Sequence, residues 1–180
     1  MIKLRRFMTP GERDTVYAHT YDHTQWPEHR ERVQATIKIA QTLIDQHGLE
    51  SVTDLSCGDG AIIDQLTIPQ KVKKDIEFDP IEITSLLMKP TDLFVCTETI
   101  EHLQAPWTVL EQLALKTKWL LVSTPLDEDP AIGNHEHYWS FSATDVANML
   151  FQSGFITRTC TRLDDPAWTY TYQIWTASVA

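Results

Sequence analysis

The chain has 180 residues, the usual length of one domain, and a chain of this size buries about 70% of its unfolded surface. Hydrophobic residues make up 42% and charged residues 22%, a composition that excludes a disordered or low-complexity protein. The formal net charge of −10 disfavours tight binding to the backbone of a nucleic acid.

No stretch of the sequence resembles a membrane span or a secretory signal. The longest aliphatic or aromatic stretch, WLLV at 119–122, is far shorter than the ~20 residues that cross a bilayer. Residues 1–14 are charged and contain no apolar core of a signal peptide. Cys57, Cys96 and Cys160 show no CxxC spacing, so we expect reduced thiols in the core or near a site. Together these features predict a cytoplasmic protein that does not bind membranes.

The N-terminal third begins with a charged segment and continues into a helix. Residues 1–14 are interrupted by proline and glycine, and we expect a loosely held arm there. From Glu28 to His47 the apolar residues recur at helical spacing, and Gly48 follows as a stop signal.

The remaining pattern alternates between strands and helices. Strands are expected at 52–56, 71–78, 91–98 and 119–125, with a short one at 81–87 and an antiparallel pair at 156–163 and 169–179. Helices are expected at 60–66, 99–116 and 142–154, the last one starting at Ser142 or Thr144. This order predicts an α/β protein with a Rossmann-like, doubly wound, mostly parallel seven-stranded sheet and a C-terminal antiparallel hairpin. Ligands bind such sheets at the carboxyl ends of the strands, near the switch in strand order.

The segment DLSCGDG, residues 54–60, follows the first predicted strand and ends in two glycines. The segments CTETIEHL, LLVSTP and HEHYWSF follow it in that order, and a terminal hairpin closes the chain. Over roughly residues 28–176 this series resembles the class I S-adenosylmethionine-dependent methyltransferases. The third glycine of the G-x-G-x-x-G pattern is missing after Gly60, so dinucleotide binding is disfavoured.

The resemblance implies that S-adenosylmethionine binds at this glycine turn. Gly58 and Gly60 would let the methionine part of the cofactor approach the backbone, with Cys57 between the strand and the glycines. Asp54 would fix the turn or the ammonium group of the cofactor. Ser56 stands where the family usually has a glycine.

The family also has a carboxylate after the second strand that accepts hydrogen bonds from the ribose hydroxyls. Asp75, Glu77 and Asp79 are the candidates in this chain, and we favour Asp75, then Glu77. Ile81 and Glu82 would flank the adenine ring, by position alone.

The end of the fourth strand is where the family places the methyl group beside the acceptor. Cys96 and Thr97 lie there as further cofactor contacts, and Glu98 follows them. If the acceptor is a hydroxyl, a base must take its proton, and His102 and His137 are the candidates.

A divalent metal ion is an open alternative at the same place. Glu-x-x-Glu-His with a downstream histidine resembles the metal site of the small-RNA 2′-O-methyltransferases, and two carboxylates with two imidazoles suit Mg²⁺, Mn²⁺ or Zn²⁺. The candidate ligands are Glu98, Glu101, His102 and His137, with His135 near the last of them. The other interpretation is that the acids cap a helix start and His102 is a packing residue.

Residues 1–27 are expected to form an arm or lid, and residues 28–180 one methyltransferase domain. Aromatic and histidine side chains gather at the end of the arm, at Tyr17, His19, Tyr21, His23 and Trp26. We expect the acceptor pocket to be built from this arm, from the loop at 126–141, and from Trp168 and Tyr170.

Three hypotheses for function follow. The first is transfer of a methyl group from S-adenosylmethionine to a hydroxyl or amine of a small-molecule or glycan-type acceptor. The second is a metal-assisted RNA 2′-O-methyltransferase-like enzyme, which the net charge of −10 opposes. The third is a protein that keeps the fold without catalysis. The sequence predicts neither the acceptor nor the oligomeric state.

Overall fold

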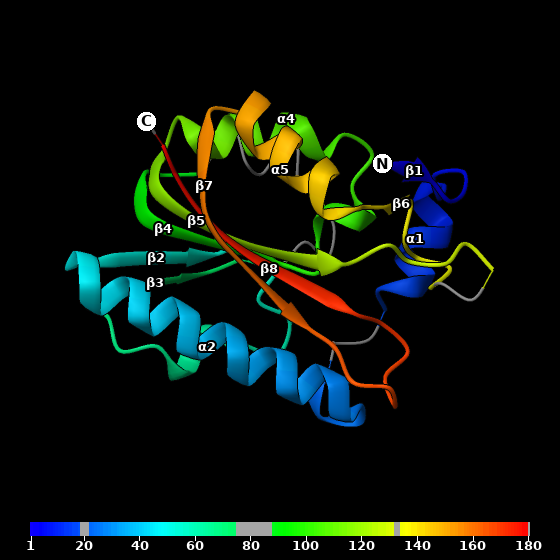
Figure 1. The fold of residues 1–180 in the computed structure, drawn as a ribbon, viewed down its shortest axis with the longest axis horizontal. Coiled ribbons are helices and arrows are strands. Elements are labelled where there is room, and N and C mark those ends of the chain that lie inside the picture. The colour runs from blue at the N-terminus through cyan, green and yellow to red at the C-terminus, as the bar shows by residue number, and fades with distance from the viewer. Residues whose placement is uncertain (19–21, 75–87, 132–133, 180) are drawn as a thin grey trace.

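The structure, a computed structural model, describes residues 1–18, 22–74, 88–131 and 134–179 and has a central mixed sheet (Figure 1). The strand order is β3-β2-β4-β5-β8-β7. The bounds are Ser51–Asp54 for β2, Gln70–Lys73 for β3, Thr91–Thr97 for β4, Thr117–Pro125 for β5, Phe155–Leu163 for β7 and Tyr172–Val179 for β8. Strands β2, β3, β4 and β5 are parallel, and β8 runs antiparallel between β5 and β7.

Helices cover both faces of this sheet. Helix α2 (Pro27–His47) lies on one face, while α4 (Pro106–Ala114) and α5 (Ala143–Gln152) lie on the other (Figure 1). The predicted apolar stripe of α2 packs in one core cluster with β2, and a second cluster joins α4 and α5 to β4 and β5. The three layers explain why β4 and β5 are continuous apolar runs: both of their faces are buried.

The predicted boundaries of α2 and α5 agree closely with those of the structure. Gly48 ends α2 in the left-handed conformation, with φ of 58°. Ser142 is the N-cap of α5, and its hydroxyl forms a capping box with Asp145.

Two predicted helices are shorter than the apolar periodicity suggested. After the glycine turn the chain forms only a 3-10 turn, η2 (Ile63–Gln65). The predicted helix over 99–116 is divided into a 3-10 turn, η3 (Ile100–His102), and α4. Pro106 explains the break, because it starts α4 and disfavours helical conformation in the residue before it.

The N-terminal arm is held more firmly than predicted. Strand β1 (Ile2–Lys3) pairs with β6 (Trp139–Ser140). After β1 the arm continues with α1 (Pro10–Val16) and a 3-10 turn, η1 (His23–Gln25). In Figure 1 these N-terminal elements lie at the right-hand end, toward which the arrows of β2 and β5 point. The arm therefore reaches the carboxyl ends of the parallel strands.

The described sheet has six strands rather than seven. The short strand predicted at 81–87 lies outside the described residues, so the seventh strand stays a prediction. The C-terminal hairpin is confirmed as β7 and β8. Among the helices that the structure describes, none is both long and apolar enough to cross a bilayer.

Candidate functional site

The glycine turn leaves the sheet at the carboxyl end of β2. Gly58 and Gly60 both adopt left-handed conformations, with φ of 49° and 80°. The turn is closed by a hydrogen bond of 2.7 Å from the amide of Gly60 to the carbonyl of Cys57. Asp54 is 1% exposed, and it accepts a hydrogen bond of 3.2 Å from the amide of Ser56. A tight turn thus follows the strand, as predicted, with Asp54 fixing its start.

Ser56 stands where the family resemblance predicts a glycine, and it joins the turn to the neighbouring strand β4. Its hydroxyl lies 2.5 Å from the hydroxyl of Thr99 and 3.3 Å from the carbonyl of Thr97. Strand β2 has β3 on one side and β4 on the other, so this turn stands where the strand order switches. Such a switch point is the usual ligand site of an open α/β sheet.

Two residues that follow β4 and β5, at the same end of the sheet as the turn, have a strained backbone conformation. Glu98 follows β4 and Asp127 follows β5, and their φ angles are 49° and 50°. Residues other than glycine rarely adopt this conformation, and in proteins such strain gathers at functional sites. Both outliers flank the same end of the sheet.

The Glu98 side chain lies between a serine and an arginine. Its Oε1 accepts a hydrogen bond of 2.7 Å from Ser123, and the Nε of Arg32 lies 4.0 Å from the same oxygen. Burial raises the pKa of Glu98, and the positive charge of Arg32 opposes that rise.

Glu101 is the most unusual acid of the site because it is fully buried, at 0% exposure. Neither of its carboxylate oxygens makes a hydrogen bond with described atoms. Burial raises the pKa of Glu101 well above its usual range, the charge of Glu98 adds to the rise, and the nearby Thr124 hydroxyl opposes it. A buried carboxyl group in this state is either protonated or stabilised by a cation.

Two imidazoles lie beside Glu101. The Nε2 of His102 is 4.0 Å from Oε1 of Glu101, and the rings of His102 and His137 meet edge to face at 4.7 Å. Burial lowers the pKa of His137 to about 4. Burial and the neighbouring His137 also lower the pKa of His102 well below its usual range. Both rings are therefore neutral near pH 7 and can accept a proton or bind a metal ion.

The Nδ1 atom of each imidazole is held by a second residue. Tyr17 from the arm places its hydroxyl 3.2 Å from Nδ1 of His102. Glu128 from the loop after β5 places Oε2 2.5 Å from Nδ1 of His137. Burial raises the pKa of Glu128 to about 7.

The structure brings together three of the four predicted metal ligands. One ligand atom from each of Glu101, His102 and His137 lies within 4.8 Å of the others. Glu98 is not in this group and contacts Ser123 instead, while His135 is exposed. Three donors of this kind are a possible cation site and also a proton-accepting site.

The thiols of two cysteines and all of the ribose and adenine candidates make no contribution to the site that the structure describes. Cys96 is 0% exposed, and burial raises its pKa to about 12, so its thiol is inert. Cys160 is neither in the core nor near the site, because its side chain is exposed on the edge strand β7. The candidates Asp75, Glu77, Asp79, Ile81 and Glu82 lie outside the described residues.

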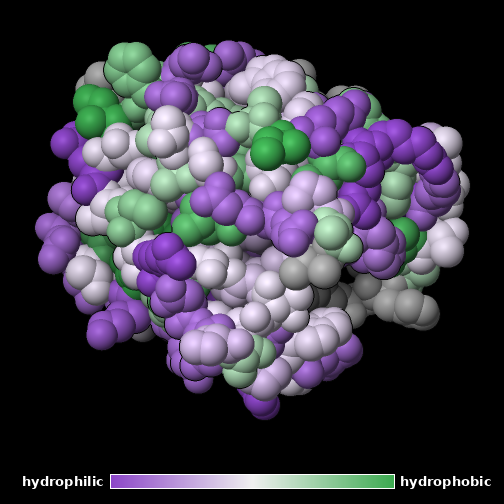
Figure 2. All heavy atoms as spheres, turned by 45° about the vertical axis from the view of Figure 1, so that its right-hand side comes forward, coloured by the Kyte–Doolittle hydropathy of each residue, from purple (hydrophilic) through white to green (hydrophobic). Residues whose placement is uncertain are grey.

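The arm contacts the site at two points. Besides the contact of Tyr17 with His102, the side chain of His23 lies 2.6 Å from Asp59 in the glycine turn. His19 and Tyr21 lie outside the described ranges. Figure 2 turns this end of the molecule forward, and there apolar residues are scattered among hydrophilic ones.

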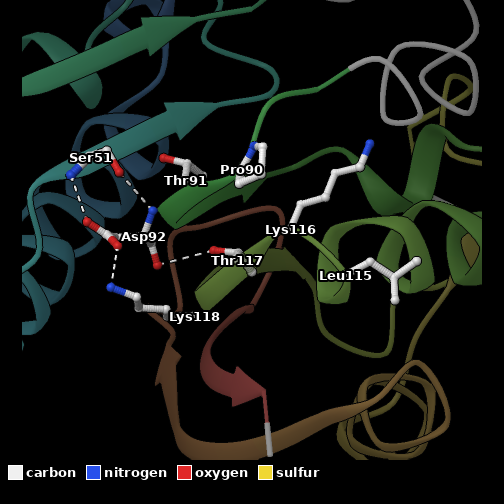
Figure 3. A pocket seen from close by; sticks show the side chains of 8 residues that line it. All are labelled: Ser51, Pro90, Thr91, Asp92, Leu115, Lys116, Thr117 and Lys118. Atoms are coloured by element: carbon white, nitrogen blue, oxygen red, sulfur yellow. Dashed lines mark hydrogen bonds and ion pairs between the residues drawn. The ribbon is translucent and has the colours of Figure 1, made fainter.

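A separate pocket of about 330 Å³ lies at the opposite, amino-terminal ends of β4 and β5 (Figure 3). Asp92 accepts a hydrogen bond of 3.2 Å from the amide of Ser51 and pairs with Lys118 at 2.8 Å. Because these groups satisfy one another and lie away from the glycine turn, the pocket is not part of the candidate site.

Sequence reasoning missed Arg32, Ser123 and Glu128. Arg32 lies within the helical pattern of α2, where a charged residue is usually exposed, yet it is 3% exposed. Glu128 stands in an acidic loop that gives no sign of burial. Tyr17 and His23 were predicted only as members of the lid.

With its three layers and its glycine turn at the switch point, the chain has the fold of the class I S-adenosylmethionine-dependent methyltransferases. The N-methyltransferase NodS from Bradyrhizobium japonicum WM9, solved with S-adenosylhomocysteine, matches with a TM-score of 0.69 and 12% identity over 94% of this chain and 97% of that one. The Burkholderia thailandensis 1,6-didemethyltoxoflavin-N1-methyltransferase, solved with its acceptor and S-adenosylhomocysteine, matches with a TM-score of 0.66 and 17% identity over 98% and 92%.

The [4+2]-cyclase SpnF has a similar structure, with a TM-score of 0.59 and 13% identity over 81% of each chain. Such a fold therefore does not by itself define the reaction. No protein-family model matches this chain, and no curated protein matches it in sequence.

Proposed function

We propose that the chain binds S-adenosylmethionine at the glycine turn and transfers its methyl group to a hydroxyl or amine of a small-molecule or glycan-type acceptor. The observation that carries the proposal is the pair of left-handed glycines, Gly58 and Gly60, at the switch point between β2 and β4. S-adenosylhomocysteine in the structures of NodS and the toxoflavin methyltransferase supports the choice of cofactor.

The reaction is an in-line displacement at the methyl carbon. A lone pair of the acceptor oxygen or nitrogen forms the new bond to carbon while the carbon–sulfur bond breaks, and S-adenosylhomocysteine leaves as a neutral thioether. Positioning the two reactants supplies much of the acceleration. A hydroxyl acceptor also loses a proton, and neutral His102 or His137 can take it. Glu98, beside Arg32 at the end of β4, is proposed to orient the acceptor.

The remaining contacts of the proposed site follow the sequence. Asp54, Ser56 and Cys57 join the glycines around the methionine part, and Thr97 and Cys96 line its reactive end through the β4 backbone. Asp75, then Glu77, is proposed to hold the ribose, with Ile81 and Glu82 at the adenine. Residues 1–27 are proposed to act as the lid over the 28–180 domain.

Calorimetric titration with S-adenosylhomocysteine tests the cofactor. The parent chain should bind with a dissociation constant on the order of micromolar. A Cβ on Gly60 would lie 2.7 Å from Asp64 Oδ2 and 2.8 Å from Lys73 Nζ, and left-handed backbone costs an L-residue roughly 1–2 kcal/mol. Gly60→Ala should therefore weaken binding at least about tenfold.

Gly48→Ala is the matched control for that titration. Gly48 is also left-handed, with φ of 58°, but it ends α2 and a Cβ there would meet nothing within 4 Å. It should lose stability by a similar amount and keep its affinity. If both variants bind as the parent does, or if the parent does not bind, the proposal fails.

A metal-assisted reaction, as in RNA 2′-O-methyltransferases, is the second candidate. The convergence of Glu101, His102 and His137 within 4.8 Å favours it, because two neutral imidazoles and a buried carboxylate with no hydrogen bond among the described residues fit a divalent cation. This donor set suits Mn²⁺ or Zn²⁺ better than Mg²⁺, which prefers oxygen ligands. Such an ion would act as a Lewis acid toward an acceptor hydroxyl.

Titration with Zn²⁺ and Mn²⁺ separates the two candidates. His137→Gln should lose metal binding, while His135→Gln, an exposed histidine in the same loop, should keep it. If the parent chain binds neither ion, or both variants bind equally, the metal-assisted candidate is excluded and the histidines remain as bases.

A further inference from the structure

The loop after β5 holds Glu128 in a fixed place. The amide of Leu126 donates to the carbonyl of Thr171 at 2.8 Å, and the amide of Asp127 donates to the carbonyl of Phe141 at 3.0 Å. Asp127 takes the left-handed conformation, with φ of 50°, in the step that precedes Glu128. Glu128 is only 5% exposed as a result.

The backbone around His137 is fixed independently of Glu128. The amide of His137 donates to the carbonyl of Asn134 at 3.1 Å, and the amide of Tyr138 donates to the carbonyl of Glu101 at 2.7 Å. These bonds place the histidine beside Glu101. They do not determine which nitrogen of its ring carries the proton.

The contact between Glu128 and His137 does determine it. Oε2 of Glu128 lies 2.5 Å from Nδ1 of His137, and the two side chains are only 1% and 7% exposed. Above its pKa of about 7, and so at the pH 8.5 of the test below, the Glu128 carboxylate is ionised, has no proton to donate and can only accept a hydrogen bond. The proton of the neutral imidazole must then be on Nδ1, and the lone pair must be on Nε2.

We propose that Glu128 is a positioning residue that holds His137 in the Nδ1-protonated tautomer and keeps the Nε2 lone pair available to an acceptor proton or a cation. This inference rests on the proposed function, and it holds whether His137 acts as a base or as a metal ligand. A carboxylate that orients a histidine in this way is a recurrent device in both kinds of site.

Nitrogen NMR of the histidine side chains tests the proposal directly. Long-range proton–nitrogen spectra at pH 8.5 distinguish protonated from unprotonated ring nitrogens, and His137→Gln assigns the signals. His137 should show a protonated Nδ1 and an unprotonated Nε2. An unprotonated Nδ1 in the parent chain would overturn the proposal.

Glu128→Gln supplies the variant. Glutamine has nearly the same shape, but it is neutral and its amide can donate to Nδ1 as well as accept from it, so the Nε2-protonated tautomer of His137 should appear beside the parent one. Glu136→Gln, in the same loop, should leave the tautomer unchanged. Glu128→Leu, which can neither accept from Nδ1 nor donate to it, should shift His137 toward the Nε2-protonated tautomer. If Glu128→Leu keeps the parent pattern, Glu128 does not set the tautomer and the proposal is wrong.

Binding of S-adenosylhomocysteine, measured on the same samples, distinguishes failure of this proposal from failure of the proposed function. Among the described residues Glu128 contacts His137 and not the glycine turn, so Glu128→Gln should bind S-adenosylhomocysteine within about twofold of the parent, since a twofold change is only a few tenths of a kcal/mol. Absence of cofactor binding in the parent would reject the proposed function while the tautomer measurement still stands.

Discussion

His23 contacts Asp59 with both its backbone and its ring. The amide of His23 donates to Oδ2 of Asp59 at 3.0 Å, and Nδ1 lies 2.6 Å from the same oxygen. Asp59 stands between Gly58 and Gly60, and its other oxygen accepts from the amide of Ala61 at 3.1 Å. The N-terminal arm is thereby joined to the glycine turn.

This contact predicts coupling between the arm and the cofactor. We expect His23→Ala and Asp59→Ala each to weaken binding of S-adenosylhomocysteine by roughly threefold to tenfold, because each removes the contact of the His23 ring with Asp59, and Asp59→Ala also removes the acceptor of the His23 amide. The double variant should be little weaker than Asp59→Ala alone. Calorimetry on the four proteins of this cycle measures the coupling, and strictly additive losses would show that the arm does not support the turn.

Arg32 is expected to be essential for stability. Its side chain is 4% exposed, lies 4.0 Å from Glu98 and stands over the ring of Tyr172 at 5.7 Å. Arg32→Met leaves Glu98 without this charge and should lower the free energy of unfolding by about 3–5 kcal/mol. Adding Glu98→Gln should restore part of that loss. Urea denaturation gives the values, and a double variant as unstable as the sum of the singles would contradict the pairing.

The lowered pKa of His29 predicts how the free energy of unfolding depends on pH. Burial, together with the nearby positive charge of Arg32, lowers the pKa of His29 to about 4. An unfolded histidine titrates near pH 6.5, so between about pH 6.5 and 4 the unfolded chain binds a proton that the folded chain does not.

Stability from His29 is therefore complete above that window and is lost as the pH falls through it, by about 1–2 kcal/mol, because solvent screens part of the effect at this half-buried ring. His29→Gln removes this contribution. Urea denaturation at pH 7 and pH 4.5 should show a smaller loss for His29→Gln than for the parent chain. Equal losses would mean that His29 titrates normally in the folded protein.

We expect Glu101 to lower the stability of the metal-free protein and to raise the stability of the zinc-bound protein. In EDTA we expect Glu101→Gln to be at least as stable as the parent, because it removes a buried carboxyl group that has no hydrogen bond to any residue that the structure describes. With Zn²⁺ at a hundred times its dissociation constant, the parent should gain about 2.7 kcal/mol and the variant should not. Thermal unfolding measures both, and an equal zinc-induced shift would place the ion elsewhere.

The architecture was predictable because it follows from local patterns. The buried strands β4 and β5 are continuous apolar runs, and α2 carries its apolar stripe up to the stop at Gly48. The glycine turn was found for the same reason, since left-handed backbone needs particular residues. One exception is the helix expected over 99–116, where the apolar spacing continues across Pro106 but the helix is interrupted before it.

The site was less predictable because it depends on contacts between distant segments. The sequence predicted His137 rather than His135 as the candidate base and ligand, but its spacing could not show that His137 lies beside Glu101 and His102. Nor could it place Arg32 against Glu98, or Glu128 against His137, because no local pattern records a tertiary contact. Glu98 was grouped with the metal candidates by spacing, and its left-handed backbone takes it to Ser123 instead.

The most direct test of the account is the amide NMR spectrum of the chain with S-adenosylhomocysteine added. We predict saturable shifts centred on Gly58 and Gly60, with further shifts at Thr97 and Glu98 and none at the pocket around Asp92. Shifts confined to other regions, or an unchanged spectrum at millimolar ligand, would show that the glycine turn only joins strand β2 to the next segment.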